Sequence, residues 1–180
     1  MTSKSIFRAA GFRLAGAVAV AAGIALAAGT TVQATDPVAV QLADATKMAA
    51  VKERQELMKS IGGNMKTLTE YVKGEGGHSA EAAETAAMKI NELAGRIPAA
   101  FETEASLSEM DAVGKNRGKP EIWLMWDEFV ESAKTLETKS ADLAGVIKGG
   151  DMAAVQAAFG DMGKNGCGGC HEEFRGPKVE

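Results

Sequence analysis

The stretch Cys167-Gly168-Gly169-Cys170-His171, close to the C-terminus, is the feature that most limits what this chain can fold into. It holds the only two cysteines of the chain, and a histidine follows the second one directly. On a helix, residues at this spacing lie on adjacent turns of one face. Two thiols and an imidazole presented together in this way are typical of a covalently attached c-type haem, with the histidine bound to the iron.

Other interpretations of the two cysteines are weaker. A thioredoxin-like redox pair requires a βαβ context, and no segment here has the pattern of a strand. A zinc site needs four ligands, which the motif and His78, the only other histidine, would supply with none to spare. A disulfide across so short a loop would stabilise the fold little. We therefore predict one haem c, attached by thioethers to Cys167 and Cys170, with His171 as an axial ligand.

The N-terminus has the composition of an export signal. Lys4, Arg8 and Arg13 come before or at the start of an apolar, alanine-rich run over residues 14–28, and Val32-Gln33-Ala34 offers small residues for cleavage. The apolar run is too short to span a bilayer. We predict a cleaved secretory signal peptide over residues 1–34 and no stable membrane insertion after cleavage.

The remaining residues, 35–180, are enough for one domain with a core of its own. Because haem is attached to such proteins after export, a bacterial periplasm is the expected location. The whole chain has a net charge of −4, and the predicted leader holds three basic and no acidic residues, so the mature chain is more acidic still. Nucleic-acid binding would need basic clusters, which the sequence lacks, so no nucleic-acid partner is expected.

Helical patterns separated by glycine-rich breaks fill the mature chain. Asp36-Pro37 can cap and start a first helix. Its apolar stripe steps by three and four residues, as a helix face requires: Val51, Arg54, Met58, Ile61, Met65, Leu68 and Val72. Gly62-Gly63 lies within it at a cost of about 1 kcal/mol per glycine relative to alanine. The pair indicates either the close approach of something bulky or a weak point in the helix.

Three further helices follow. Ser79 can cap the second, which ends or bends at Pro98. The third opens at Lys119-Pro120 and closes at Gly149-Gly150. Its expected buried face is Ile122, Trp126, Phe129, Ala133, Leu136, Ser140, Leu143 and Ile147.

Asp151 caps the fourth helix. Met152, Val155, Phe159 and Met162 should face inward, and the helix should run on through the haem motif. Glycines at 160, 163 and 166 allow a kink before that motif. Short first and third connections predict an all-α fold, an antiparallel up-down-up-down four-helix bundle with covalently bound haem.

Together these features resemble the class II cytochromes c. The resemblance covers nearly all of the mature chain and is carried by residues 54–65, by Lys119-Pro120-Glu121-Ile122-Trp123, and by the haem motif with the following Glu172-Glu173-Phe174-Arg175. It implies a four-helix bundle with the haem motif near its C-terminus. In class I cytochromes c a methionine ligand follows the motif. No methionine follows His171, so a sixth ligand must come from upstream.

The resemblance implies that one first-helix position, here Met58, decides the function. In a low-spin branch of the family a methionine at this position binds the iron, and the protein carries single electrons. In the cytochrome c′ branch the residue only covers an open iron face, and the protein binds nitric oxide or carbon monoxide. We favour Met58 as a ligand, and the second interpretation stays open. No distal histidine or acid is placed for proton handling, so we do not expect an enzyme.

Arg54 lies on the apolar stripe, where an arginine is costly unless it is paired. The resemblance favours a salt bridge to a haem propionate, and the alternative is a side chain that reaches a surface carboxylate. Arg175 has the same two interpretations, a salt bridge to a haem propionate or a contact with a surface carboxylate, and here the surface carboxylate is favoured. His78 is expected at the surface. Redox partner proteins are expected but not identifiable, and the resemblance implies homodimers formed through the first two helices.

Overall fold

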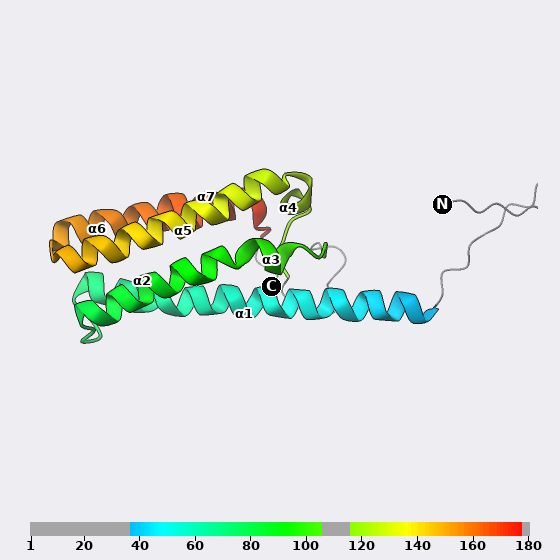
Figure 1. Ribbon diagram of the computed structural model, residues 1–180, viewed down its shortest axis with the longest axis horizontal. Coiled ribbons are helices and arrows are strands. Elements are labelled where there is room, and N and C mark those ends of the chain that lie inside the picture. Colours follow the sequence, from blue (N-terminus) through cyan, green and yellow to red (C-terminus); the bar gives the residue numbers. More distant parts are fainter. Residues whose placement is uncertain (1–36, 106–115, 178–180) are drawn as a thin grey trace, which may run out of the picture. The chain divides into compact units, whose positions relative to one another are not determined.

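The computed structural model describes residues 37–105 and 116–177, which belong to one compact unit, Thr35–Glu180 (Figure 1). The predicted signal peptide and the Asp36 cap lie outside the described residues. Among these residues, the only pairing of β type is an isolated bridge between Gly118 and Arg175. No helix in the described ranges is both long and apolar enough to cross a membrane.

Four helical stretches form the predicted antiparallel bundle (Figure 1). The first is α1 (Pro37–Lys73), and the second is α2 (Ala80–Gly95) with the short α3 (Ile97–Phe101). The third consists of α4 (Glu121–Leu124) and α5 (Trp126–Gly149). The fourth consists of α6 (Met152–Asp161), the π-helix η2 (Met162–Gly168) and α7 (Gly169–Phe174). The helix α2 packs on both α1 and α5, α5 packs on α6 and η2, and α6 packs on α1, so the four stretches surround a common interior.

The helix α1 passes through Gly62-Gly63 without a break. Its predicted stripe is buried or half-buried throughout, and Leu57, which the stripe did not include, is buried beside it. The chain then turns through Gly74, Gly76 and Gly77, all at positive φ, a backbone conformation that glycine adopts without steric cost. The Ser79 cap is confirmed, because its Oγ accepts a hydrogen bond from the Ala82 backbone N–H at 3.2 Å.

The second stretch breaks where proline was expected to end or bend it. Pro98 lies in the first turn of α3, where its missing N–H costs no helical bond, and α2 ends just before, at Gly95. The apolar side chains that recur at helical spacing along this stretch are buried: Ala83, Ala86, Ile90, Leu93 and Ile97.

The third helix differs from the prediction of one continuous element. Met125 has φ −124° and ψ 51°, outside the helical region, and separates α4 from α5. This break lets the proline-led turn of α4 pack beside α7 while α5 follows the bundle. The predicted inward face is still buried, except for Trp126, which is half-buried. Gly150, at φ 78°, ends α5 in the left-handed conformation that favours glycine.

The fourth stretch begins as predicted, because Asp151 Oδ1 accepts hydrogen bonds from the backbone N–H groups of Ala153 and Ala154 at 3.0 and 3.3 Å. Val155 and Met162 are buried, but the prediction for Met152 is wrong. It is 40% exposed, because it is the first residue of α6 and lies at the α5–α6 connection. The glycine-rich part, expected to allow a kink, forms the π-helix η2.

Candidate haem site

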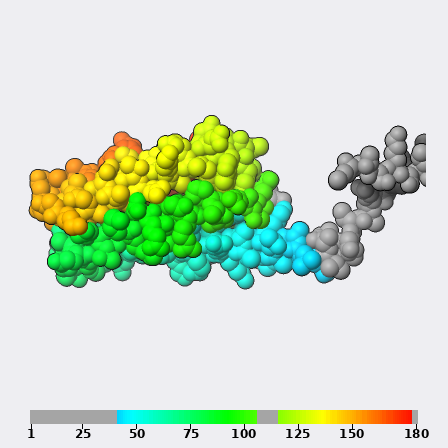
Figure 2. All heavy atoms as spheres, in the orientation of Figure 1, coloured from blue at the N-terminus to red at the C-terminus, as the bar shows by residue number. Residues whose placement is uncertain are grey.

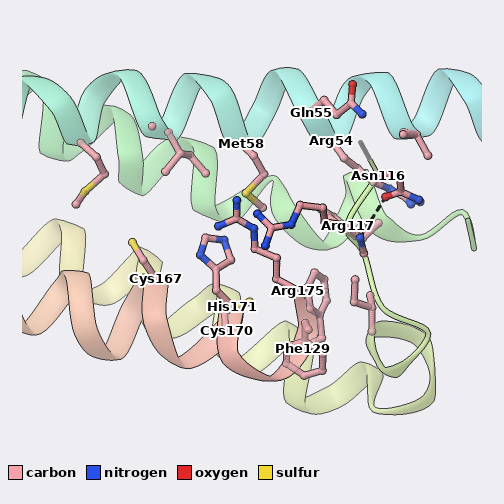
Figure 3. A pocket seen from close by; sticks show the side chains of 18 residues that line it. Arg54, Gln55, Met58, Asn116, Arg117, Phe129, Cys167, Cys170, His171 and Arg175 are labelled. Carbon is pink, nitrogen blue, oxygen red and sulfur yellow. Dashed lines mark hydrogen bonds between the residues drawn. The ribbon is translucent and has the colours of Figure 1, made fainter. Parts of the chain in front are cut away.

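A cavity of about 530 Å³ lies between the middle of α1 and the η2–α7 stretch (Figure 3). Its volume is within the range of about 300–1,000 Å³ that is usual for small-molecule sites. The segment before α4 and the aromatic ring of Phe129 complete its lining. Every site residue predicted from the sequence lines this one cavity: Arg54, Met58, Cys167, Cys170 and His171.

The motif wall of the cavity consists of Cys167 at the end of η2 and Cys170 and His171 in α7. This wall lies close to α5 because Gly166 has no side chain. A Cβ at Gly166 would lie 3.1 Å from Leu136 Cδ1 and 3.4 Å from Leu136 Cα. A π-helix widens one turn of an otherwise α-helical stretch, and such turns are frequent at functional sites. Here it directly precedes the second cysteine and the histidine.

Both cysteines are half-buried and neither forms a disulfide. Burial raises the pKa of the Cys167 thiol. Burial, together with the neighbouring Cys167, raises the pKa of Cys170 to about 11. A thioredoxin-like pair needs a lowered thiol pKa, because the thiolate is the reactive form. The environment of these thiols is therefore the opposite of what a dithiol redox site requires.

The imidazole of His171 is exposed because it faces the cavity rather than the core (Figure 3). The protein around it still lowers the pKa of His171, mainly by excluding water and further through the positive charges of Arg175 and Arg117. These influences favour the neutral imidazole, which is the form that binds a metal ion.

Met58 lies on the α1 wall, across the cavity from His171 (Figure 3). It is half-buried against the core, and together with His171 it also lines a smaller adjoining space of about 30 Å³. Met65, two turns later on α1, lines the main cavity as well. The other described methionines do not line it, and Met162 is fully buried in η2.

Arg54 is only 4% exposed, and it has contacts that neither interpretation of the sequence included. Its guanidinium donates to the backbone carbonyls of Ala100 at 2.9 Å and Ala105 at 3.3 Å, and also to that of Thr103. It lies over the rings of Phe101 and Trp123, with Cζ 4.7 and 5.3 Å from their centroids.

Burial lowers the pKa of Arg54 to about 10, although Glu53 opposes the shift. The expected alternative, a bond to a surface carboxylate, is wrong for the described residues. Arg54 instead holds the end of α3 against α1. Its contact with a haem propionate stays a prediction.

The zinc interpretation fails because His78 lies elsewhere. Its Nε2 is 2.8 Å from Glu70 Oε2, at the α1–α2 connection, and it does not line the cavity. It is half-buried rather than freely solvated, which corrects the surface prediction. No group of three or more histidine, cysteine or acidic side chains in the described ranges could hold a metal ion.

The residues present fit a haem. Two thiols and an imidazole come from one wall and a thioether from the other, and the lining between them is largely apolar, with Ile61, Ile122 and Phe129 among its members. At Gly62, on the α1 wall, an added Cβ would meet no protein atom within 4 Å, so the cavity is open there.

Comparison with known proteins decides the family. The model of the family described as cytochrome c′ matches residues 49–175, which include α1 from its second third onward and the haem motif. This chain belongs to the cytochrome c′ family. The cofactor of the family is one covalently attached haem c, and the presence of Cys167 and Cys170 near the C-terminus is consistent with its Cys-x-x-Cys-His motif.

Relatives in the cytochrome c′ family include both cytochromes c′ and cytochromes c-556. A cytochrome c′ of Pararhodospirillum photometricum is 33% identical over 73% of this chain and 99% of its own length. A cytochrome c-556 of Rhodopseudomonas palustris is 34% identical over 69% of this chain and 81% of its own length. A solved cytochrome c′ with an unusual ligand-controlled dimer dissociation is 28% identical, with a TM-score of 0.61, over 73% of this chain and 97% of its own.

The sequence interpretation missed the segment before α4. Asn116, Arg117 and Gly118 line the cavity, although the connection they belong to carried no predicted role. A signal was present, because the segment directly precedes the Lys119–Trp123 stretch that carries part of the family resemblance. An arginine between Asn116 and Gly118 in a connection has no helical periodicity, so the pattern that revealed Arg54 could not reveal Arg117.

Proposed function

We propose that this protein is an exported one-electron carrier whose haem iron is low-spin, with His171 and Met58 as its axial ligands. The observation that carries the proposal is the position of Met58, which lines the same cavity as His171 from the opposite wall. The bound haem supplies the one-electron chemistry, and the protein supplies its binding, orientation and electrostatics.

Histidine and methionine suit this role for a chemical reason. A His/Met pair raises the reduction potential relative to other ligand sets. Both side chains project from helices that are packed into the bundle, so both ligands can stay bound in the two oxidation states. The described lining contains no acidic residue and no second histidine that could move protons, which supports electron carriage over catalysis.

Export to a bacterial periplasm remains part of this proposal. It rests on the basic start, the short apolar run and the small residues before Thr35, together with a cofactor that is attached after export. We also infer a homodimer through α1 and α2. Three of the five exposed large hydrophobic side chains in the described residues lie on these helices: Leu42, Met48 and Met88. One solved relative is itself described as a dimer.

The test compares Met58→Leu with Met65→Leu in the haem-loaded protein. Both substitutions conserve volume, and both residues line the cavity from α1, but only Met58 is proposed to bind iron. We expect the unmutated protein and Met65→Leu to be low-spin, with a near-infrared charge-transfer band between methionine sulfur and ferric iron. Met58→Leu should lose that band, become high-spin and bind carbon monoxide when reduced.

A high-spin unmutated protein that readily binds carbon monoxide would contradict the proposal. The protein would then be five-coordinate, with Met58 as a cover over the iron and a gas as the ligand. An unchanged spectrum in Met58→Leu would also contradict it, because another residue would then be the sixth ligand.

A further inference from the structure

Positive charge is concentrated at the cavity. Acidic residues outnumber basic ones in the whole chain, 24 to 20. Yet three of the four described arginines, Arg54, Arg117 and Arg175, line the cavity, and none of the described aspartates and glutamates does. Like charges gathered beside an apolar surface repel each other and are poorly solvated. Such a cluster calls for an anionic group in the cavity.

Arg117 is held at the cavity by the C-terminal tail. Its Nε donates to the carbonyl oxygens of Gly176 and Pro177 at 2.9 and 3.0 Å. The backbone supports this contact, because the Gly176 N–H donates to the Arg117 carbonyl at 2.7 Å and the Lys119 N–H donates to the Phe174 carbonyl at 3.1 Å. The segment before α4 is therefore tied to the residues that directly follow the haem helix α7.

These bonds use one edge of the Arg117 guanidinium. Its two terminal nitrogens have no hydrogen bond to any described residue and point into the cavity (Figure 3). Arg54 differs, because its Nε and both terminal nitrogens already donate to carbonyls at the end of α3. Among the described residues, the terminal nitrogens of Arg117 therefore have no partner, whereas those of Arg54 have one each.

Arg175 lies next to Arg117 in space, because an isolated β-bridge pairs its backbone with that of Gly118. Its side chain extends into the cavity beside that of Arg117 (Figure 3). Burial, and next the positive charge of Arg117, lower the pKa of Arg175. No described carboxylate forms an ion pair with either side chain, so the described residues do not neutralise the pair.

We propose that Arg117 and Arg175 together bind the carboxylate groups of the haem. The two propionates are the only anionic substituents of the cofactor, and a guanidinium can donate two parallel hydrogen bonds to a carboxylate. The pair thereby fixes which edge of the haem lies at the α4 end of the cavity, and it holds positive charge close to the iron. This inference rests on the family cofactor and does not depend on whether Met58 binds iron.

The first experiment measures the reduction potential against pH for Arg117→Gln and Arg175→Gln. Arg96→Gln is the matched control. It removes the same charge, but Arg96 is exposed and lies outside the cavity. A nearby cation disfavours the more positive ferric state and keeps a carboxylate ionised at lower pH. Both cavity variants should therefore lower the potential and move its pH-dependent region to higher pH. Arg117→Lys keeps the positive charge, so its potential and its pH profile should lie between those of Arg117→Gln and the unmutated protein.

The second measurement needs no variant and decides the question if the substitutions prevent folding. A crystal structure of the unmutated, haem-loaded protein should place nitrogens of Arg117 and Arg175 within about 3.2 Å of haem carboxylate oxygens. The proposal is overturned if both guanidinium groups turn away from the carboxylates, or if both cavity variants behave like Arg96→Gln. A failure of the Met58 proposal looks different, because it would be seen as a high-spin unmutated protein and not as an unchanged pH profile in the arginine variants.

Discussion

The two walls of the haem cavity are built in different ways. The η2–α7 wall is local in sequence, and its three functional side chains lie within five consecutive residues, Cys167 to His171. The α1 wall is part of a 37-residue helix, and it contributes one candidate ligand, Met58. The first wall carries the motif that indicates the cofactor. In our proposal the second wall decides whether the iron keeps an open position, so cofactor and function would be encoded in separate parts of the chain.

The glycines of the two walls also serve different ends. Gly166, on the motif wall, allows close contact with Leu136 of α5, so its role lies in the packing of the protein. Gly62, on the α1 wall, borders open space at the cavity, so a side chain there would contact the cofactor rather than the protein. Figure 2 shows one outer face of the bundle, where the atoms of α2 and α5 lie side by side.

The largest effect should come from the motif wall. Replacing both Cys167 and Cys170 by serine removes the only two thiols of the chain, so no thioether can form. We expect all haem to be extracted by acid acetone from the double variant and none from the unmutated protein. Each single variant should keep one bond and resist extraction. Release of haem from the unmutated protein would show that attachment is not covalent.

Packing behind the motif wall should produce the next largest effect. Gly166→Ala places a methyl group 3.1 Å from Leu136 Cδ1 and 3.4 Å from its Cα, so either the side chain or the backbone must shift. We expect a loss of about 1–3 kcal/mol in the free energy of unfolding, measured by urea titration of the haem-loaded protein.

Gly163→Ala, in the same π-helix, is the control for Gly166→Ala. Its added methyl group meets no atom within 4 Å, so it should not destabilise the protein. Equal losses in the two variants would mean that the π-helix needs glycine for its backbone conformation and not for contact with α5.

On the α1 wall, the adjacent glycines form a natural pair for comparison. Neither Gly62 nor Gly63 would place a Cβ near a protein atom, but only Gly62 lines the cavity. Gly63→Ala should stabilise the loaded protein by up to about 1 kcal/mol, because alanine favours the helix. Gly62→Ala should gain less and should shift the haem absorption band, because its methyl group faces the cofactor. If the two variants gain the same stability and neither shifts the haem band, both glycines only weaken the helix and neither makes room for the cofactor.

The smallest effect should arise away from both walls, at Glu70 and His78. The hydrogen bond from His78 is the main cause that lowers the pKa of Glu70 below its usual 4.5. A lowered carboxyl pKa stabilises the fold above the unfolded-state pKa, and this contribution is lost as the pH falls through the folded-state value. Glu70→Gln should therefore make the melting temperature fall less steeply below pH 4.5.

His78→Ala should flatten the same acid region, because it removes the partner that shifts Glu70. The haem spectrum should stay unchanged in both variants, since neither residue lines the cavity. An unchanged acid profile in Glu70→Gln would show that solvent screens this half-buried pair completely.

Much of this protein could be predicted from sequence because the relevant signals are local. The haem motif needs only five residues in a row, and the helix faces follow from apolar residues three and four apart. Ser79 and Asp151 cap helices through hydrogen bonds to residues two or three positions away. The sequence also placed Met58 and Arg54 on a single helical face with the correct spacing, and both line the cavity.

The tertiary structure alone decided the features that depend on distant segments. Arg54 binds carbonyls 46 to 51 residues away, and Arg117 binds carbonyls 59 and 60 residues away. The break at Met125 and the π-helix beside Leu136 reflect how α4, α5 and η2 pack together. Periodicity reports which face of a helix is buried, but not what lies against that face. Cysteine spacing could therefore identify the cofactor, whereas Arg117, which we propose to hold its carboxylates together with Arg175, became visible only where the tail meets the segment before α4.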